Sequence, residues 1–351
     1  MAQEVFENSD LLQYLNIKTK SASRGSKSRA SFANLYAIYV LVEDYVKRGF
    51  HQTGSYSEYQ GAQFTTLFYR QRELPFGAKL QNHALNHRLN EEFRKYFPQS
   101  EYLPILRDVE AAKYWFSESL LLVETPDGVA NISQAVLRII DAYIDAKRGA
   151  FETFIEDVEK LQNLRNNEPE EARQFIYSLL QPNVDAHIFE IVSYAILREF
   201  YAGQVIYWGW DLDSIREDSL TLYKTGRTNA NDGGIDFVMK PLGRFFQVTE
   251  TIDMRKYFLD IDKIQKYPLT FVVKTQDTVD NTRSKIEQHA RRIYQVNRIV
   301  ELYMEAIEEI INIPVLLERL DEVIIRNQLT SIIEQIIIHS KLEFNYPIGT
   351  R

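Results

Sequence analysis

The spacing of apolar residues along this chain predicts helices first and strands later. Between Ser31 and Arg48 the apolar residues recur at helical spacing, which indicates a helix that buries one face. The same spacing predicts helices over 62–73 and 78–97, and a mostly helical region over 101–180. We therefore expect the first half of the chain to be mainly helical.

A different pattern begins after residue 182. A helix is predicted over 185–202, and short apolar runs bounded by turn residues then predict strands. The elements predicted after this helix are strands over 204–208, 220–223, 235–239 and 244–249, a helix over 253–266 and a strand over 269–273. This order predicts a compact core in which helices flank a mixed sheet.

Helical spacing returns after Asp280 and continues to about Lys341, with a break at Pro314. Isoleucine and leucine are denser there than one buried helical stripe requires. We expect these helices either to pack on the core or to form the interface of a homodimer. The whole pattern predicts an α+β protein with a mainly helical section over 1–180, a core over 181–280 and C-terminal helices over 281–351.

The composition is that of an ordinary globular protein and excludes several kinds of chemistry. The chain has no cysteine, which excludes disulfides, cysteine zinc sites and a thiol nucleophile. Neither a signal peptide nor an apolar run of about 18 residues is evident, so we expect a cytoplasmic protein without membrane contact. No glycine-rich loop followed by Lys-Ser/Thr is found, so we expect no nucleotide cofactor.

The formal net charge of −8 counts against a general nucleic-acid coat, but it does not exclude a DNA enzyme. Charges act locally, over a Debye length of about 8–10 Å. A basic arm over 17–31 gathers lysine and arginine without any acidic residue. We expect this arm either to wrap DNA or to be a plain linker.

One predicted hairpin carries most of the candidate chemistry. If residues 240–243 form its turn, Asp236 on the first strand lies opposite Gln247 on the second. Directly opposed residues have Cβ atoms about 4.5–5.5 Å apart, so two oxygen ligands there can share one cation. A buried carboxylate is costly without compensation, and Mg²⁺ prefers oxygen ligands. The alternative is a buried hydrogen-bonded pair.

Two other acidic residues are candidates for the same site. Glu190 lies on a strongly apolar predicted helix, where a charge needs a partner. It is expected either to assist at the cation or to pair with a nearby basic residue. A bulge in the second strand would make Glu250 the ligand in place of Gln247.

A short motif in the hairpin resembles the signature of the PD-(D/E)XK nuclease superfamily. It consists of Asp232-Gly233-Gly234-Ile235-Asp236 and, after ten further residues, Gln247-Val248-Thr249. It is most similar to the restriction-endonuclease branch with Gly-Gly-Ile-Asp and Gln-x-Lys motifs, which includes Mrr-like enzymes, over about residues 185–275. The resemblance implies a PD-(D/E)XK core in which Asp236, Gln247 and Glu190 hold Mg²⁺ and a metal-activated water hydrolyses DNA.

The motif departs from the family at Thr249, where the family has a lysine that positions water or stabilises charge. Thr249 would still line the site. Lys240 lies about 13 Å from Asp236 along the strand, which is too far to replace that lysine. Lys256 on the following helix and Lys274 at the end of the last strand are the candidate substitutes. Without a substitute, the protein would have a degenerate, non-cleaving nuclease fold.

The predicted helix over 78–97 is a second candidate region, because its polar face is rich in asparagine. Asparagine is a poor helix former, but it reads adenine edges in the major groove. We therefore expect this face to read DNA, with arginines holding phosphates. The candidates are Arg70, Arg72, Lys79, Asn82, His83, Asn86, His87, Arg88 and Asn90. The alternatives are a plain solvated face and a histidine metal pair without an evident third ligand.

These expectations lead to one principal hypothesis and two competing ones. The principal hypothesis is a Mg²⁺-dependent type II restriction endonuclease that cuts double-stranded DNA at a specific sequence as a homodimer. One alternative is a modification-dependent or repair nuclease on the same core. The other is a DNA-binding protein that does not cleave.

Overall fold

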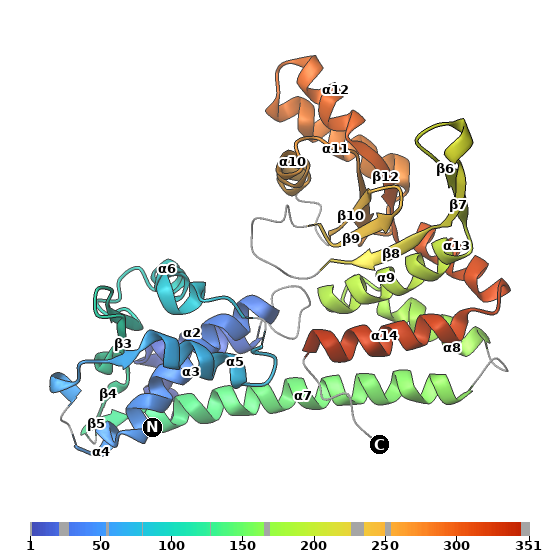
Figure 1. Cartoon of the computed structure of the whole chain (residues 1–351). Coiled ribbons are helices and arrows are strands. Elements are labelled where there is room, and N and C mark those ends of the chain that lie inside the picture. The colour runs from blue at the N-terminus through green and yellow to red at the C-terminus, as the bar shows by residue number, and fades with distance from the viewer. Residues whose placement is uncertain are drawn as a thin grey trace. The chain divides into compact units, whose positions relative to one another are not determined.

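The computed structural model describes residues 2–20, 28–53, 56–78, 80–126, 128–164, 169–225, 235–249 and 254–344. Within these residues the fold combines helices with several small sheets, which confirms the predicted α+β class. The chain divides into two compact units, Met1–Phe154 with Glu343–Arg351 and Ile155–Leu342 (Figure 1). Each unit has a hydrophobic core of its own.

Helices make up most of the first unit. They are α1 (Ala2–Glu7), α2 (Asp10–Lys20), α3 (Ser28–Lys47), α4 (Phe50–Thr53), α5 (Phe64–Glu73), the π-helical turn η3 (Ala84–Arg88), α6 (Leu89–Tyr96) and the first part of α7 (Ser133–Leu164). Single 3₁₀ turns are η2 (Tyr56–Glu58) and η4 (Glu118–Leu120). The predicted helices over 31–48 and 62–73 correspond to α3 and α5.

The prediction that 101–180 is mostly helical is wrong for residues 105–131. That part forms short strands in two antiparallel sheets, ordered β1-β3-β2 and β4-β5. The strands are β1 (Ala62–Gln63), β2 (Ile105–Asp108), β3 (Lys113–Phe116), β4 (Leu122–Thr125) and β5 (Gly128–Asn131). These segments lack a clear alternation of apolar and polar residues, so pairing with other strands decides their conformation.

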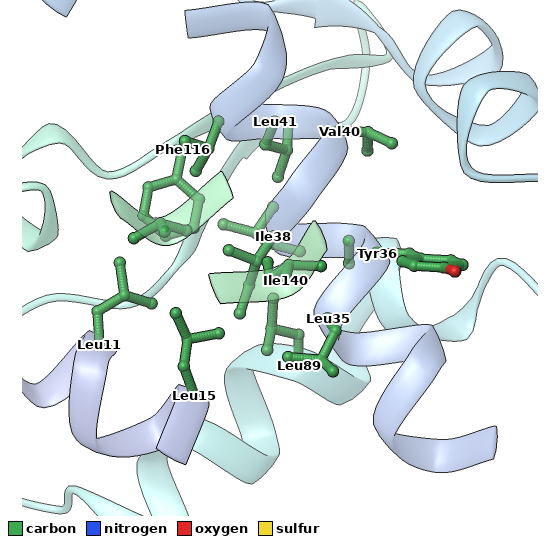
Figure 2. Packing of buried hydrophobic residues seen from close by; sticks show 14 of the residues in the cluster. Leu11, Leu15, Leu35, Tyr36, Ile38, Val40, Leu41, Leu89, Phe116 and Ile140 are labelled. Atoms are coloured by element: carbon green, nitrogen blue, oxygen red, sulfur yellow. The ribbon is translucent and has the colours of Figure 1, made fainter. Parts of the chain in front are cut away.

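The core of the first unit is built around α3. Figure 2 shows apolar side chains from α2, α3, β3, α6 and α7 meeting there. Leu11, Ile38, Leu89, Phe116 and Ile140 are among them, and each is fully buried. Burying a side chain of this size contributes about 1.5–3 kcal/mol relative to leaving it exposed.

The second unit contains the remaining elements. Its helices are the rest of α7, α8 (Pro169–Leu179), α9 (Ala186–Ala202), the 3₁₀ turn η6 (Leu212–Ser214), α10 (Met254–Lys263), α11 (Val279–Ile293), α12 (Asn297–Glu305), α13 (Ile313–Ile325) and α14 (Leu329–Phe344). Its strands are β6 (Val205–Trp208), β7 (Arg216–Ser219), β8 (Thr221–Lys224), β9 (Phe237–Lys240), β10 (Arg244–Thr249), β11 (Leu269–Val273) and β12 (Ile307–Ile311).

A mixed five-stranded sheet in the described residues has the order β12-β11-β10-β9-β8. Strands β8, β9 and β10 are antiparallel neighbours, whereas β10, β11 and β12 run parallel. On one face Tyr194 and Tyr201 of α9 contact Phe237 and Phe246. On the other face α10 packs against β11 through a core that also includes α11 and α12.

Two details of this unit differ from the sequence prediction. Residues 307–311 form the edge strand β12, although the pattern predicted helix there. Ile307, Ile310 and Ile311 are all buried, and β-branched side chains suit a pleated sheet. The predicted strand over 204–208 does form, but it pairs with the unpredicted β7 as a separate hairpin.

The C-terminal helices of this unit include α13, which lies directly against α9. The helix begins after Asn312, whose side chain accepts a hydrogen bond from the Val315 amide at 2.9 Å. Pro314 is therefore in the first turn of the helix, where its missing N–H costs nothing. No helix in the described ranges is both long and apolar enough to cross a bilayer.

Candidate functional site

The β9–β10 hairpin has the register that the sequence predicted. Arg244 lies opposite Met239, and Phe246 lies opposite Phe237. The Gly243 amide donates to the Met239 carbonyl at 2.9 Å, and Gly243 has a φ of 67°, which favours glycine. The ladder continues as the Asp236 amide donates to the Phe246 carbonyl at 3.0 Å.

Asp236 and Gln247 meet at the open end of this hairpin. Gln247 Nε2 donates to Asp236 Oδ2 at 2.8 Å, and the Val248 amide donates to the same oxygen at 2.7 Å. The carboxylate thus takes the place of the next backbone acceptor in the ladder. The sequence predicted either a shared cation or a hydrogen bond between these two side chains. The structure contains the hydrogen bond.

The amide of Gln247 has an unused acceptor. Its side chain is buried, and Oε1 has no hydrogen-bond partner in the described part of the chain. The hydroxyl of Thr249, two residues along the same face, is likewise buried without a partner there. An unsatisfied buried polar atom costs about 1–3 kcal/mol, so an electropositive species beside these oxygens would be stabilising.

Glu190 lies on α9 and pairs with a lysine. Its Oε1 is 2.9 Å from Lys224 Nζ, and its Oε2 is 3.9 Å from His187 Nδ1. Burial raises the pKa of Glu190, but His187 and Lys224 outweigh this and hold the pKa below its ordinary value. Lys224 is opposite Phe237 in the register, one residue from Asp236.

The register places these acids on different faces of the sheet. Phe237 and Phe246 point toward α9, so side chains at alternate positions, including Gln247, point the other way. Gln247 shares its face with Phe271, on which Tyr257 of α10 packs with ring centroids 4.6 Å apart. The structure therefore joins Asp236 to Gln247, and Glu190 to Lys224 on the α9 face.

The candidate substitutes for the absent lysine have different positions. The Lys274 amide donates to the Thr249 carbonyl at 2.9 Å, so the two residues are neighbours across β10 and β11. Lys274 is buried; its ammonium donates to the Val184 carbonyl and lies 5.6 Å from the Phe189 ring, at the start of α9. Glu250 and the side chain of Lys256 lie outside the described residues.

Strand directions bring these groups to one edge of the sheet. The edge contains the first residue before β9 and the last residues of β8, β10 and β11, with the first turns of α9 beside it. Sequence reasoning missed Lys224, although a lysine ending the apolar run 220–223 was a signal. Among the described residues, no group of three or more His, Asp or Glu side chains is arranged to hold a metal ion.

The helix that was predicted to read DNA is shorter than expected, and its first turn is a π-helix, which is wider than an α-helix. Helix begins near residue 83 rather than 78 and opens with the π-helical turn η3 before α6. Asn90 is occupied within the fold, because its amide exchanges hydrogen bonds with the Ile105 backbone at 2.8 and 2.9 Å. Asn86 accepts a hydrogen bond from the Tyr114 hydroxyl at 3.1 Å. These two side chains attach the helix to β2 and β3.

The other candidates for DNA contact fall into three groups. Arg70 forms a bidentate pair with Glu43 at 2.8 and 2.9 Å, and Arg72 donates to the Ala78 carbonyl at 2.7 Å. Arg72, His83, His87 and Arg88 are exposed, and Asn82 is partly exposed. The two histidine rings have centroids 5.9 Å apart. Lys79 and residues 21–27 of the basic arm lie outside the described residues. Residues 17–20 of the arm instead end α2 and residues 28–31 begin α3, so the expectation of a linker is wrong for these parts, and Lys18 is buried.

Comparison with known proteins does not place this chain in a family. The chain matches no protein-family model, no curated protein and no solved structure.

Proposed function

We propose that this protein is a Mg²⁺-dependent endonuclease with a PD-(D/E)XK core, which cuts double-stranded DNA as a homodimeric type II restriction enzyme. The observation that supports this best is the contact between Asp236 and Gln247 at the open end of the β9–β10 hairpin. The buried, unpartnered Oε1 of Gln247 beside a carboxylate is an arrangement that a cation would complete. The order α9, β8-β9-β10, α10, β11 is consistent with the same core.

The donor set at this edge suits a hard cation, since it consists of oxygens. Asp236 and Gln247 would hold Mg²⁺ from adjacent strands. Glu190 would approach from α9, giving up its ion pair with Lys224 to bind the cation. A bound Mg²⁺ would supply a Lewis acid that polarises the phosphate and lowers the pKa of water. Asp236 and Gln247 need no change in the β9–β10 register to serve as ligands, whereas Glu190 would have to leave the opposite face of the sheet.

This chain's own residues would perform the remaining tasks. The Val248 amide orients the Asp236 carboxylate through a 2.7 Å hydrogen bond. The ammonium groups of Lys224 and Lys274 belong to the same edge of the sheet and would stabilise phosphate charge in place of the lysine absent at Thr249.

Substitution of Asp236 tests this proposal. Asp236→Ala is expected to lower the rate of plasmid cleavage in Mg²⁺ at least about a hundredfold, since it removes the central charged ligand. It should also abolish the rise in melting temperature that Mg²⁺ causes in the wild type. Asp280→Ala, which removes an exposed carboxylate from α11, is the matched control. Undiminished cleavage by folded Asp236→Ala protein would overturn the assignment.

A second candidate function is DNA binding without cleavage. It is favoured by the hydrogen bond from Gln247 Nε2 to Asp236, which satisfies the carboxylate without an ion, and by Thr249 in place of a lysine. In this case the wild type would bind duplex DNA but would not cut any substrate in Mg²⁺ or Mn²⁺. The Asp236→Ala protein would then bind DNA as the wild type does.

A further inference from the structure

The β6–β7 hairpin exposes an unusual amount of apolar surface. Trp210 is 92% exposed and Leu212 is 87% exposed at the hairpin loop. Tyr207, Ile215 and Val205 add further exposed side chains along the same hairpin. Figure 1 shows the hairpin standing clear of the five-stranded sheet. Single exposed apolar residues are ordinary, but a contiguous group of this kind is typical of an interaction surface.

The loop of this hairpin is held in one conformation. Asp211 Oδ1 accepts from the Ser214 amide at 2.8 Å, and Ser214 Oγ accepts from the amides of Trp210 and Asp211 at 2.9 and 3.0 Å. A Cβ at Gly209 would lie 2.7 Å from the Ile215 nitrogen, so the close approach of the two strands requires glycine. A preorganised loop loses little entropy when it binds.

The charge of the hairpin indicates what kind of partner it fits. Between residues 205 and 219 there are four acidic residues and one arginine: Asp211, Asp213, Glu217, Asp218 and Arg216. The arginine is stacked over the Trp208 ring at 4.2 Å. An acidic loop is repelled by nucleic-acid phosphates, so the complementary surface is an apolar pocket with a basic rim.

The first unit contains a pocket with these properties. It lies between α3, α5, β1 and β3 and encloses about 370 Å³. Apolar atoms of Val40, Ala62 and Leu67 line it, as do four basic and two acidic side chains: Lys47, Arg48, Arg70, Lys113, Glu43 and Asp44. Lys47 and Arg70 pair with Glu43, and Arg48 pairs with Asp44, so the positive charge that the acids leave over is concentrated at Lys113. Another pocket of the same unit contains Asp10 and Glu101 and no basic residue, so it would repel the hairpin.

We propose that the β6–β7 hairpin of one copy of this chain docks into the α3–α5 pocket of a second copy. Trp210 and Leu212 fill the apolar part of the pocket, and Asp213 faces Lys113 at its rim. Tryptophan beside arginine and lysine also gains from cation–π attraction. This contact supplies an interface for the homodimer of the proposed function, but it does not depend on nuclease activity.

The first experiment measures molar mass by light scattering across a range of protein concentrations. The wild type is expected to form dimers, and Trp210→Ala is expected to raise the dimer dissociation constant at least about tenfold, because tryptophan in a desolvated pocket is a typical hot spot. Ile325→Ala removes another apolar side chain, 79% exposed, from the same unit and should leave the constant unchanged.

A charge exchange tests the pairing of the rim. Asp213→Lys and Lys113→Asp are each expected to weaken the dimer, whereas the two substitutions in one chain restore it to within about threefold of the wild type. Asp211 is unsuitable for this exchange because its carboxylate holds the loop. Circular dichroism of each variant would establish that it is folded.

A disulfide cross-link tests directly whether the hairpin of one copy lies against the pocket of another. The chain has no cysteine, so Leu212→Cys protein mixed with Gln63→Cys protein should give an oxidised dimer on a non-reducing gel, in higher yield than either alone. A wild type that stays monomeric, or a Trp210→Ala protein that dimerises normally, would overturn the proposal. Loss of DNA binding by Trp210→Ala without a change in mass would assign the hairpin to DNA and overturn it as well.

Discussion

Asn90 and Arg70 have partners inside the protein that spacing along the chain does not reveal. Both were expected to contact DNA, yet Asn90 holds the backbone of Ile105 and Arg70 holds Glu43. A phosphate contact by Arg70 would require this ion pair to break. Sequence patterns indicate that a polar residue needs partners, but the fold decides which partners are within reach.

The Arg70–Glu43 pair predicts a pH-dependent effect on stability. Burial raises the pKa of Glu43, but hydrogen bonds from Arg70 and Lys47 hold it below its ordinary value of 4.5. The lowered pKa means that this stabilisation is complete above about pH 4.5 and is lost as the pH falls further. Arg70→Met should lower the free energy of unfolding by about 1–2 kcal/mol at pH 7 and by less at pH 3.

Urea titrations of both proteins at the two pH values would measure this difference. Arg94→Met removes an exposed arginine from α6 and should change the free energy of unfolding little at either pH. An Arg70→Met effect that is as large at pH 3 as at pH 7 would show that packing, rather than the charge of Glu43, is responsible.

At the scale of elements, a network of charged groups joins β10, β12 and α13 at the end of the sheet opposite the candidate site. Arg244 of β10 and Arg319 of α13 both bind the Glu309 carboxylate on β12. Arg244 Nε also donates to the Thr270 hydroxyl at 3.0 Å. Because β12 was predicted as helix, no sequence pattern could place Glu309 between two arginines.

Removal of the shared carboxylate should therefore be costly. Glu309→Leu is expected to lower the free energy of unfolding by about 2–3 kcal/mol, since two partly buried guanidinium groups lose the carboxylate they share and Arg244 keeps only Glu308 as a carboxylate contact. Glu308→Leu, which loses only a contact with Arg244 at 3.2 Å, should cost less than about 1 kcal/mol. Equal effects in urea unfolding would contradict the central role of Glu309.

At the scale of the whole molecule, the described chain forms two units with separate cores. Leu89 is fully buried in the first and Phe271 in the second. Proteins with separate cores open in separate cooperative units, and the stability of one need not follow the other. The proposed DNA-contacting residues belong to the first unit and the candidate catalytic edge to the second.

Hydrogen exchange can test the independence of the two units. Leu89→Ala should cost about 2–5 kcal/mol and accelerate amide exchange within residues 2–154, while β10 and β11 keep their protection. Phe271→Ala should give the reverse pattern. Accelerated exchange throughout the chain in both variants would show that the two units unfold as one.

The sequence by itself determined the elements whose signals are local and strong. The period of two in 235–249, with Gly243 in the turn, predicted the hairpin register and the meeting of Asp236 with Gln247. The long helical spacing at 31–48 and 185–202 predicted α3 and α9. These elements follow from side-chain alternation and helical periodicity, which neighbouring residues set without help from distant ones.

Only the tertiary structure decided the short strands and the partners of charged groups. Strands β2–β5, β7 and β12 show no clear alternation of apolar and polar residues, and their conformation comes from the strands they pair with, which for β12 is β11, more than 30 residues away in the sequence. Lys224 reaches Glu190 because β8 lies beside α9, a contact across 34 positions of sequence that no spacing rule describes. Non-local packing free energy, rather than local propensity, settles such positions.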